Sequence, residues 1–182
     1  STMRFYHPHC IDPNGGFFHF FRDDGEIYDR HTRHLVSSTR FVFNYSMAYQ
    51  QFGGDEYRAA VAHGIKFLRD AHRDPASGGY TWLLRDGEKI DTTNHCYGLA
   101  FVALAYSKAI EAGFTDAAAH LDETWNLMEK HFWEPQYGLY ADEADAEGLV
   151  EFYSHVSAQS KYYRFFAPMP ELSARDVERF TT

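Results

Sequence analysis

Arg40 and Tyr97 are polar side chains at equivalent places in two long apolar segments. When these segments are aligned on Ala48 and Ala105, Arg40 falls opposite Tyr97, where each apolar run begins. A guanidinium or phenol in such a setting needs a polar partner. Arg40 therefore either forms a buried ion pair, with a neighbour such as Asp91, or donates hydrogen bonds to the oxygens of a ligand in a cavity. Both alternatives stay open at this point.

His95 lies two residues before Tyr97 and is a third candidate. Its imidazole suits either a hydrogen bond to a ligand hydroxyl or a structural hydrogen bond. Carboxylates near the starts of the expected helices offer a different chemistry, and these are Asp91, Asp142 and Glu143. A pair of them across a cavity is what a glycoside hydrolase requires. Hydrolysis is therefore the alternative reaction to consider.

The histidines and cysteines lack the spacing that is typical of a metal site. The chain has 11 His, but none forms an HExxH pattern. The histidine pairs near enough in sequence to share a metal are His7 with His9 and His31 with His34. Cys10 and Cys96 are far apart and outside any CxxC pattern. We expect two reduced thiols and no metal site.

The composition indicates a globular protein with a sizeable core. Of 182 residues, 45% are hydrophobic and 18% are aromatic, which suits one domain. The aromatic rings serve either as core or as the stacking walls of a sugar pocket. The net charge is −9 and the charges are interspersed, so no basic patch is available for nucleic acid or anionic lipid. We expect a cytoplasmic protein that binds neither nucleic acid nor membrane.

A repeated pattern indicates which elements position the candidate residues. The stretch at 15–26 recurs at 78–88 and, more weakly, from residue 137, a period of about 60 residues. We expect one domain over 1–182, composed of repeats at about 15–77, 78–136 and 137–182.

Each full repeat is predicted to hold a β-hairpin followed by two helices. Asp24-Gly25 and Asp86-Gly87 are typical of hairpin turns that need positive φ. The predicted hairpins cover 17–28 and 80–90. The predicted helices cover 32–52, 55–74, 93–112 and 115–131, with glycines or proline at their ends.

The two helices of a repeat differ in polarity. The first is apolar on nearly every side, whereas the second has one apolar stripe, such as Val61, Ile65 and Leu68. This contrast predicts an inner and an outer layer. Repetition of inner helix, outer helix and rim hairpin builds an α/α toroid around a cavity. We therefore predict an all-α fold, a partial toroid of about three repeats with short β-hairpins at one rim.

Both ends of the chain resemble cut edges of this toroid. Residues 2–6 resemble the last turn of a helix before Pro8, and 150–166 can form one more helix that stops at Pro168, followed by a short one at 173–180. An open toroid exposes apolar end faces. We expect these faces to be covered by the tail, by another copy or by a missing C-terminal half.

Four stretches together resemble the N-acylglucosamine 2-epimerase family, most closely its mannose isomerase-like branch. They are Arg4–Pro8, Gly15–Phe18, Thr39–Val42 and Asn94–Phe101. The resemblance covers about residues 3–147. It implies a barrel of six helical hairpins, of which this chain carries about the N-terminal half.

The resemblance implies a sugar isomerase or epimerase and gives roles to the candidate residues. By this resemblance, Arg40 holds the sugar and Tyr97 lines the sugar pocket. We add His95 as a third substrate-binding candidate. The implied reaction is mannose–fructose isomerisation or 2-epimerisation of an N-acylhexosamine. A proton is removed next to the carbonyl of the ring-opened sugar, through an enediol(ate) and with two histidines as acid and base. Such a proton shuttle requires no metal or organic cofactor.

The catalytic histidines are where the chain departs from the family. The Arg-Gly-x-Asn-x-Asn-Met-His motif expected after the third hairpin is absent, and none of the 11 His matches the acid–base pair by motif. We therefore expect sugar-binding residues without acid–base catalysis, and an inactive isolated chain. An α/α-toroid glycoside hydrolase and a non-catalytic carbohydrate-binding fragment are the alternatives.

Overall fold

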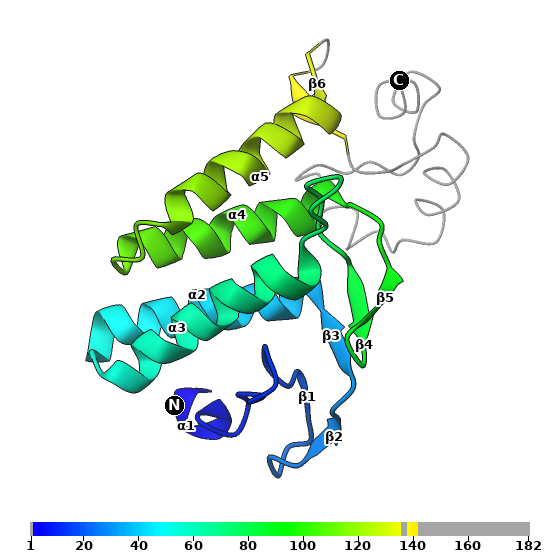
Figure 1. Ribbon diagram of the computed structural model, residues 1–182. Coiled ribbons are helices and arrows are strands. Elements are labelled where there is room, and N and C mark those ends of the chain that lie inside the picture. The colour runs from blue at the N-terminus through cyan, green and yellow to red at the C-terminus, as the bar shows by residue number, and fades with distance from the viewer. Residues whose placement is uncertain (1, 136–137, 142–182) are drawn as a thin grey trace, which may run out of the picture. The chain divides into compact units, whose positions relative to one another are not determined.

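The computed structural model describes residues 2–135 and 138–141 (Figure 1). Residues up to His131 form one compact unit, and a second unit begins at Phe132. The first unit is helix-rich and carries short β-strands. No helix among the described residues is long and apolar enough to cross a bilayer. The predicted division of one domain into three repeats stays a prediction.

Four long helices and one short helix make up most of the first unit. They are α1 (Thr2–Tyr6), α2 (Leu35–Phe52), α3 (Asp55–Phe67), α4 (Cys96–Glu111) and α5 (Ala117–His131). A π-helical turn, η1 (Leu68–His72), continues α3. The glycine stops predicted for α2 and α4 are confirmed, since Gly53 directly follows α2, Gly113 lies two residues after the end of α4, and both adopt positive φ.

The predicted hairpins are confirmed as short antiparallel pairs. The strands are β1 (Phe20–Phe21), β2 (Ile27–Asp29), β3 (Thr32–His34), β4 (Leu83–Arg85), β5 (Glu88–Asp91), β6 (Trp133–Glu134) and β7 (Leu139–Tyr140). β1 pairs with β2, β4 with β5, and β6 with β7. In the second hairpin, Asp86 and Gly87 both have positive φ, as a two-residue turn between twisted strands requires.

The helix predicted from residue 32 begins three residues later. Residues Thr32–His34 form β3, which lies antiparallel to β4 with Arg33 opposite Leu84. This pairing extends the second hairpin to the three-stranded sheet β3-β4-β5. The partner strand lies about 50 residues further along the chain, so no local pattern in 32–34 reveals it. The prediction of helix at these residues is wrong for this reason.

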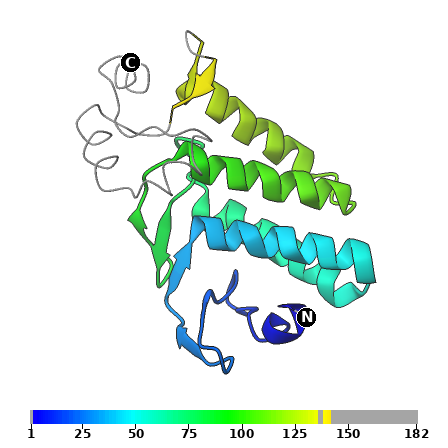
Figure 2. The ribbon, with the colours of Figure 1, turned by 180° about the vertical axis from the view of Figure 1, so that it is seen from behind.

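The helices pack as two layers. α2 contacts both α3 and α4, and α4 contacts α5. Figures 1 and 2 show α4 between α2 and α5, and the β3-β4-β5 sheet at the ends where α2 and α4 begin. Val42 and Tyr45 of α2 and Val102 of α4 are fully buried in this packing.

One face of the inner pair is open, which corrects the expectation that these helices are covered on nearly every side. On α2 this face carries Arg40, Asn44 and Met47, all exposed. On α4 it carries Tyr97, with 51% of its surface exposed, and Leu104, with 47%. The positions recur every three or four residues and so form one stripe on each helix.

The predictions for the chain ends have different outcomes. The turn of helix predicted at 2–6 is confirmed as α1. The predicted helices at 150–166 and 173–180 lie outside the described residues.

Candidate functional site

Arg40 and Tyr97 are brought together by a phenylalanine that lies between them. Arg40 projects from α2, and its Cζ atom lies 5.2 Å from the centre of the Phe101 ring on α4. The Tyr97 ring meets the same Phe101 ring edge-on, with 5.0 Å between the ring centres. A guanidinium at this distance from a phenyl ring is attracted by the ring quadrupole. The two predicted residues therefore belong to one cluster, and Phe101 joins them.

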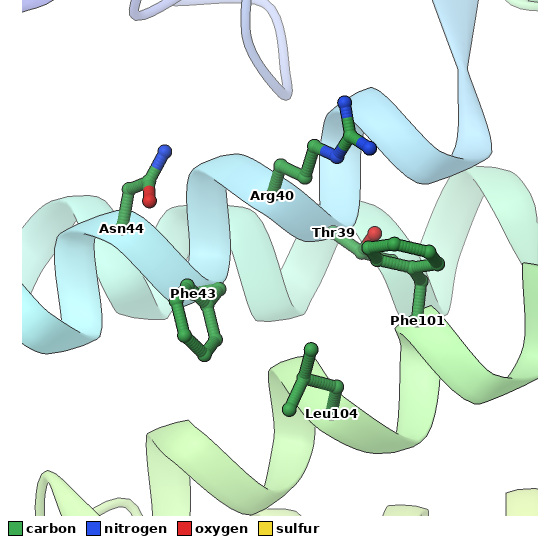
Figure 3. A pocket seen from close by; sticks show the side chains of 6 residues that line it. All are labelled: Thr39, Arg40, Phe43, Asn44, Phe101 and Leu104. Carbon is green, nitrogen blue, oxygen red and sulfur yellow. The ribbon is translucent and has the colours of Figure 1, made fainter. Parts of the chain in front are cut away.

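A hollow of about 260 Å³ opens beside this cluster, between α2 and α4 (Figure 3). It is lined by Thr39, Arg40, Phe43, Asn44, Phe101 and Leu104. Figure 3 shows Arg40 and Asn44 on α2, with Phe43 turned toward Leu104 of α4. Apolar walls with a few polar groups are typical of small-molecule sites. Asn44 adds an amide one helical turn after Arg40, where it can donate and accept hydrogen bonds.

Arg40 does not form the ion pair with Asp91 that we considered from the sequence. Among residues 2–135 and 138–141 it has no carboxylate partner within salt-bridge distance. The Asp91 carboxylate instead accepts a hydrogen bond from the Thr93 backbone N–H at 2.9 Å. Hydrogen bonds from Thr93 hold the pKa of Asp91 below its ordinary value, and nearby His95 and His34 lower it further. The Arg40 guanidinium is exposed, and its donors are available to a ligand.

His95 lies at the N-terminal end of the same helix, outside the Phe101 cluster. It is the N-cap residue of α4, and His34 is the N-cap residue of α2. The Trp82 ring meets both imidazoles edge-on, with centre distances of 4.5 Å to His95 and 4.4 Å to His34. Trp82 therefore links the starts of the two inner helices.

His34 is electrostatically coupled to the candidate residues. Burial lowers its pKa below the ordinary value, the positive charge of Arg40 lowers it next, and Asp91 partly offsets both. Its Nδ1 accepts a hydrogen bond from the Val36 backbone N–H at 3.3 Å, which caps α2. The Arg40 charge therefore acts on His34 at the start of α2.

Gly98 allows Trp82 to approach α4 closely. An added Cβ at Gly98 would lie 2.8 Å from the Trp82 ring and 3.3 Å from the Leu35 side chain. The Trp82 backbone is equally engaged, since its carbonyl accepts a hydrogen bond from Leu35 N–H at the start of α2. Close packing against Trp82 thus explains why the residue at position 98 is glycine.

A buried hydrogen-bond chain holds the start of α2 against both hairpins. The His34 backbone N–H donates to Nδ1 of His19 at 3.2 Å, so the proton of neutral His19 is on Nε2, which donates to Ser38. The Ser38 hydroxyl donates to Nε2 of His72 at 2.9 Å, and Nδ1 of His72 donates to the Thr81 carbonyl at 2.8 Å. Every donor direction is fixed by the two backbone groups at the ends.

Burial is the main reason that both histidines of this chain are neutral. It lowers the pKa of His19 to about 3 and the pKa of His72 to about 4, and the positive charge of Arg33 adds to both shifts. Arg33 itself is buried and paired with Asp12 at 2.6 Å. The histidines are therefore placed as structural links between elements.

Three of the remaining histidine and cysteine candidates, His7, His31 and Cys10, have structural partners. His7 Nδ1 lies 3.1 Å from the Tyr45 hydroxyl, and His31 Nδ1 lies 2.5 Å from Asp86. Cys10 also bonds to the Tyr45 hydroxyl, and burial raises its thiol pKa to about 11. Within the part of the chain that the structure describes, no three His, Cys, Asp or Glu side chains are grouped to hold a metal ion. Asp142 and Glu143, proposed as hydrolase carboxylates, lie outside the described residues.

Three residues of this region were not identified as site candidates from the sequence, namely Asn44, Trp82 and Phe101, and His34 was considered only as a metal ligand. A signal existed for Trp82, because the repeat alignment puts it opposite His19, which also contacts the start of an inner helix. Phe101 gave no such signal, because it stands in an apolar run where a core position is the ordinary expectation.

Comparisons with known proteins agree on one family. The family model for N-acylglucosamine 2-epimerase matches residues 16–161. A D-mannose isomerase of Marinomonas mediterranea is 56% identical over 147 residues, which are 81% of this chain and 37% of that protein. A cellobiose 2-epimerase of Eubacterium cellulosolvens is 33% identical over 131 residues, 71% of this chain and 32% of that protein.

A crystal structure of a D-mannose isomerase superposes with a TM-score of 0.76 and 44% identity, covering 98% of this chain and 47% of the other. The chain spans about a third of the length of the curated relatives that it matches.

Proposed function

Because the chain belongs to the N-acylglucosamine 2-epimerase family, we propose that it is the sugar-binding N-terminal part of a longer sugar isomerase or epimerase. Mannose–fructose isomerisation is the favoured reaction, since the relative with 56% identity is a D-mannose isomerase. 2-Epimerisation, as in the cellobiose 2-epimerases, is the second candidate. The substrate of the whole protein is a monosaccharide in the first case.

The proposed architecture is a partial α/α toroid whose cavity lies on the open face of α2 and α4. The pairing of α2 with α3 and of α4 with α5, with α2 and α4 in contact, supports an inner and an outer layer. The exposed stripes on both inner helices then line the cavity. The remaining repeats, and with them the acid–base groups, come from the part of the protein that follows this chain.

Arg40 carries the proposed binding role. An exposed guanidinium with no carboxylate partner among the described residues has up to five N–H donors for the oxygens of a sugar. It keeps its charge at any working pH and can stabilise negative charge on the oxygen of an enediolate. Tyr97 and Phe101 provide aromatic walls beside it, and His95 lies at the helix start that borders this cluster.

The reaction that this arrangement supports is proton transfer next to the carbonyl of the open-chain sugar. Arg40 would bind the carbonyl or hydroxyl oxygen, while histidines outside this chain remove and return the proton. Such a mechanism needs no metal or organic cofactor.

The test uses the full-length protein that contains this chain. Incubation with D-mannose should yield D-fructose, measured by chromatography, and D-fructose should yield D-mannose. Conversion of cellobiose to its 2-epimer, with no reaction of mannose, would assign the epimerase reaction instead. Release of a free sugar from a glycoside, with neither of the other reactions, would contradict the proposal and favour a hydrolase.

A further inference from the structure

We propose that Phe101 is a positioning residue of the sugar site, which orients the Arg40 guanidinium without using any of its hydrogen-bond donors. This inference rests on the proposed sugar-binding function of Arg40. It assigns a role to a side chain that contacts the arginine and need not contact the reacting atoms. The supporting observations are the partners that Arg40 has and those that it lacks.

The first observation is the kind of contact that stabilises the Arg40 charge within the described part of the chain. Its Cζ atom lies 5.2 Å from the Phe101 ring centre. Within residues 2–135 and 138–141, no carboxylate pairs with it. The buried arginine of this unit, Arg33, shows the contrast, because it donates to Asp12 and to the Arg30 and Thr32 carbonyls.

The chemical difference between these two environments decides what each arginine can do. A carboxylate orients a guanidinium by accepting its N–H groups, and those groups are then lost to a ligand. A phenyl ring attracts the cation through its π-face and accepts none of the in-plane N–H groups. Arg33 is thus suited to hold the fold together. Arg40 is suited to bind neighbouring sugar oxygens while its side chain is already restrained.

The second observation is that the ring is itself held in place. Phe101 is half-buried on α4, and the Tyr97 ring contacts it edge-on at 5.0 Å. Tyr97 is one helical turn before it on the same face. Gly98 lies between them and allows this part of α4 to approach Trp82. The Arg40 side chain of α2 therefore lies over a half-buried ring of α4 that also contacts Tyr97.

A matched control lies outside the hollow. Phe114 is half-buried like Phe101, and the Cζ atom of Arg58 lies 5.5 Å from its ring centre. Loss of either ring removes an aromatic contact with an arginine. Only the loss of Phe101 removes the contact with Arg40.

The experiment compares variants of the full-length enzyme. Phe101→Leu should lower kcat/KM for the sugar by roughly fivefold to tenfold, whereas Phe114→Leu should lower it less than about twofold. Phe101→Tyr should retain the wild-type value, because a phenol ring also attracts cations. In the Arg40→Ala background, Phe101→Leu should cause no further loss, because its effect passes through Arg40.

A second measurement tests the role of Phe101 even if the Phe101→Leu variant does not fold. Phenylalanines with increasing fluorination at position 101 keep the ring shape but weaken its attraction for a cation. The value of kcat/KM should fall stepwise with the number of fluorines at 101 and stay constant with the same series at 114.

The outcomes separate the two proposals. A full-length protein that transforms no sugar overturns both. An active enzyme in which Phe101→Leu has the same kcat/KM as Phe114→Leu, or in which fluorination at 101 has no effect, overturns the role of Phe101 alone. The role of Phe101 is also overturned if Phe101→Leu lowers kcat/KM as much in the Arg40→Ala background as in the wild-type enzyme.

Discussion

Arg40 and Arg33 are seven residues apart and show two opposite uses of a guanidinium. Arg33 is buried, and its donors are used by Asp12 and by backbone carbonyls. Arg40 is exposed on the open face of α2 and rests on an aromatic ring. Arg33 therefore contributes to the free energy of unfolding. The N–H donors of Arg40 can bind a ligand.

Arg40→Ala should leave folding intact and reduce catalysis. In the full-length enzyme we expect kcat/KM to fall at least about 10²-fold, an effect on the order of 3 kcal/mol. The melting temperature should change little, because the side chain is exposed. The matched control is Arg58→Ala, an exposed arginine over the Phe114 ring on the other layer, which should affect neither quantity. A large fall in melting temperature with normal turnover of the folded fraction would assign Arg40 to the scaffold.

Gly98→Ala should destabilise the protein although alanine favours helices. The new Cβ would lie 2.8 Å from the Trp82 ring, which has imidazoles on both sides. We expect the clash to outweigh the gain in helix propensity and to reduce the free energy of unfolding by about 1–2 kcal/mol. Urea denaturation measures this change, and exposed Ala100→Ser is the control in the same helix. An increase in stability would mean that Trp82 has room to move.

At the scale of elements, the sequence predicted what depends on local chemistry. The Asp86-Gly87 turn and the glycine at 53 were readable because positive φ restricts residue type. Arg40 and Tyr97 were readable as polar side chains at matching places in apolar runs. The strand at Thr32–His34 and the position of Trp82 between two histidines were not, because both depend on contacts between distant segments.

The buried histidine chain should make the packing of hairpins on α2 sensitive to acid. The pKa values of His19 and His72 are lowered to about 3 and about 4 in the folded protein, from an ordinary value of 6.5. Their neutral forms therefore contribute stability that is fully present above about pH 6.5 and is lost as the pH falls toward 4. We expect the free energy of unfolding to drop by at least about 2 kcal/mol across this range.

Urea denaturation at several pH values measures this drop. His72→Gln should flatten the dependence, whereas His131→Gln, which changes an exposed histidine, should not. Asp29, Asp74, Asp91 and Glu123 also have lowered pKa values, so their contribution is lost at lower pH than that of the histidines. A flat curve between pH 6.5 and 4.5 would contradict the neutral assignment.

At the scale of the whole molecule, the chain corresponds to about a third of its curated relatives, and the open face of α2 and α4 is one wall of the proposed cavity. A wall can bind and orient a sugar, but in the proposed enzyme the groups that transfer the proton lie outside this chain. Binding and chemistry are thus expected to reside in different segments of the full-length enzyme.

The 182-residue chain alone should show little or no isomerase turnover. Each missing acid or base forfeits roughly 10²–10⁴-fold in rate. Assays of the chain and of the full-length enzyme at equal concentration, with D-mannose as substrate, measure this difference. Robust turnover by a chain whose mass has been verified would show that the catalytic groups lie within it.

The strand β3 has a consequence for how such a protein can be recombined. In the predicted division into repeats it precedes α2 in the first repeat, yet it pairs with β4, which that division assigns to the second. A crossover between residues 77 and 78, the boundary suggested by the glycine pattern, would therefore separate β3 from its partner. In a grafted second repeat, β4 would have to pair in register with Thr32–His34 of the preceding repeat. Only then would the inner helix of the grafted repeat begin at its native position. The unit that can be exchanged between members of the family thus includes the strand borrowed from the repeat before it.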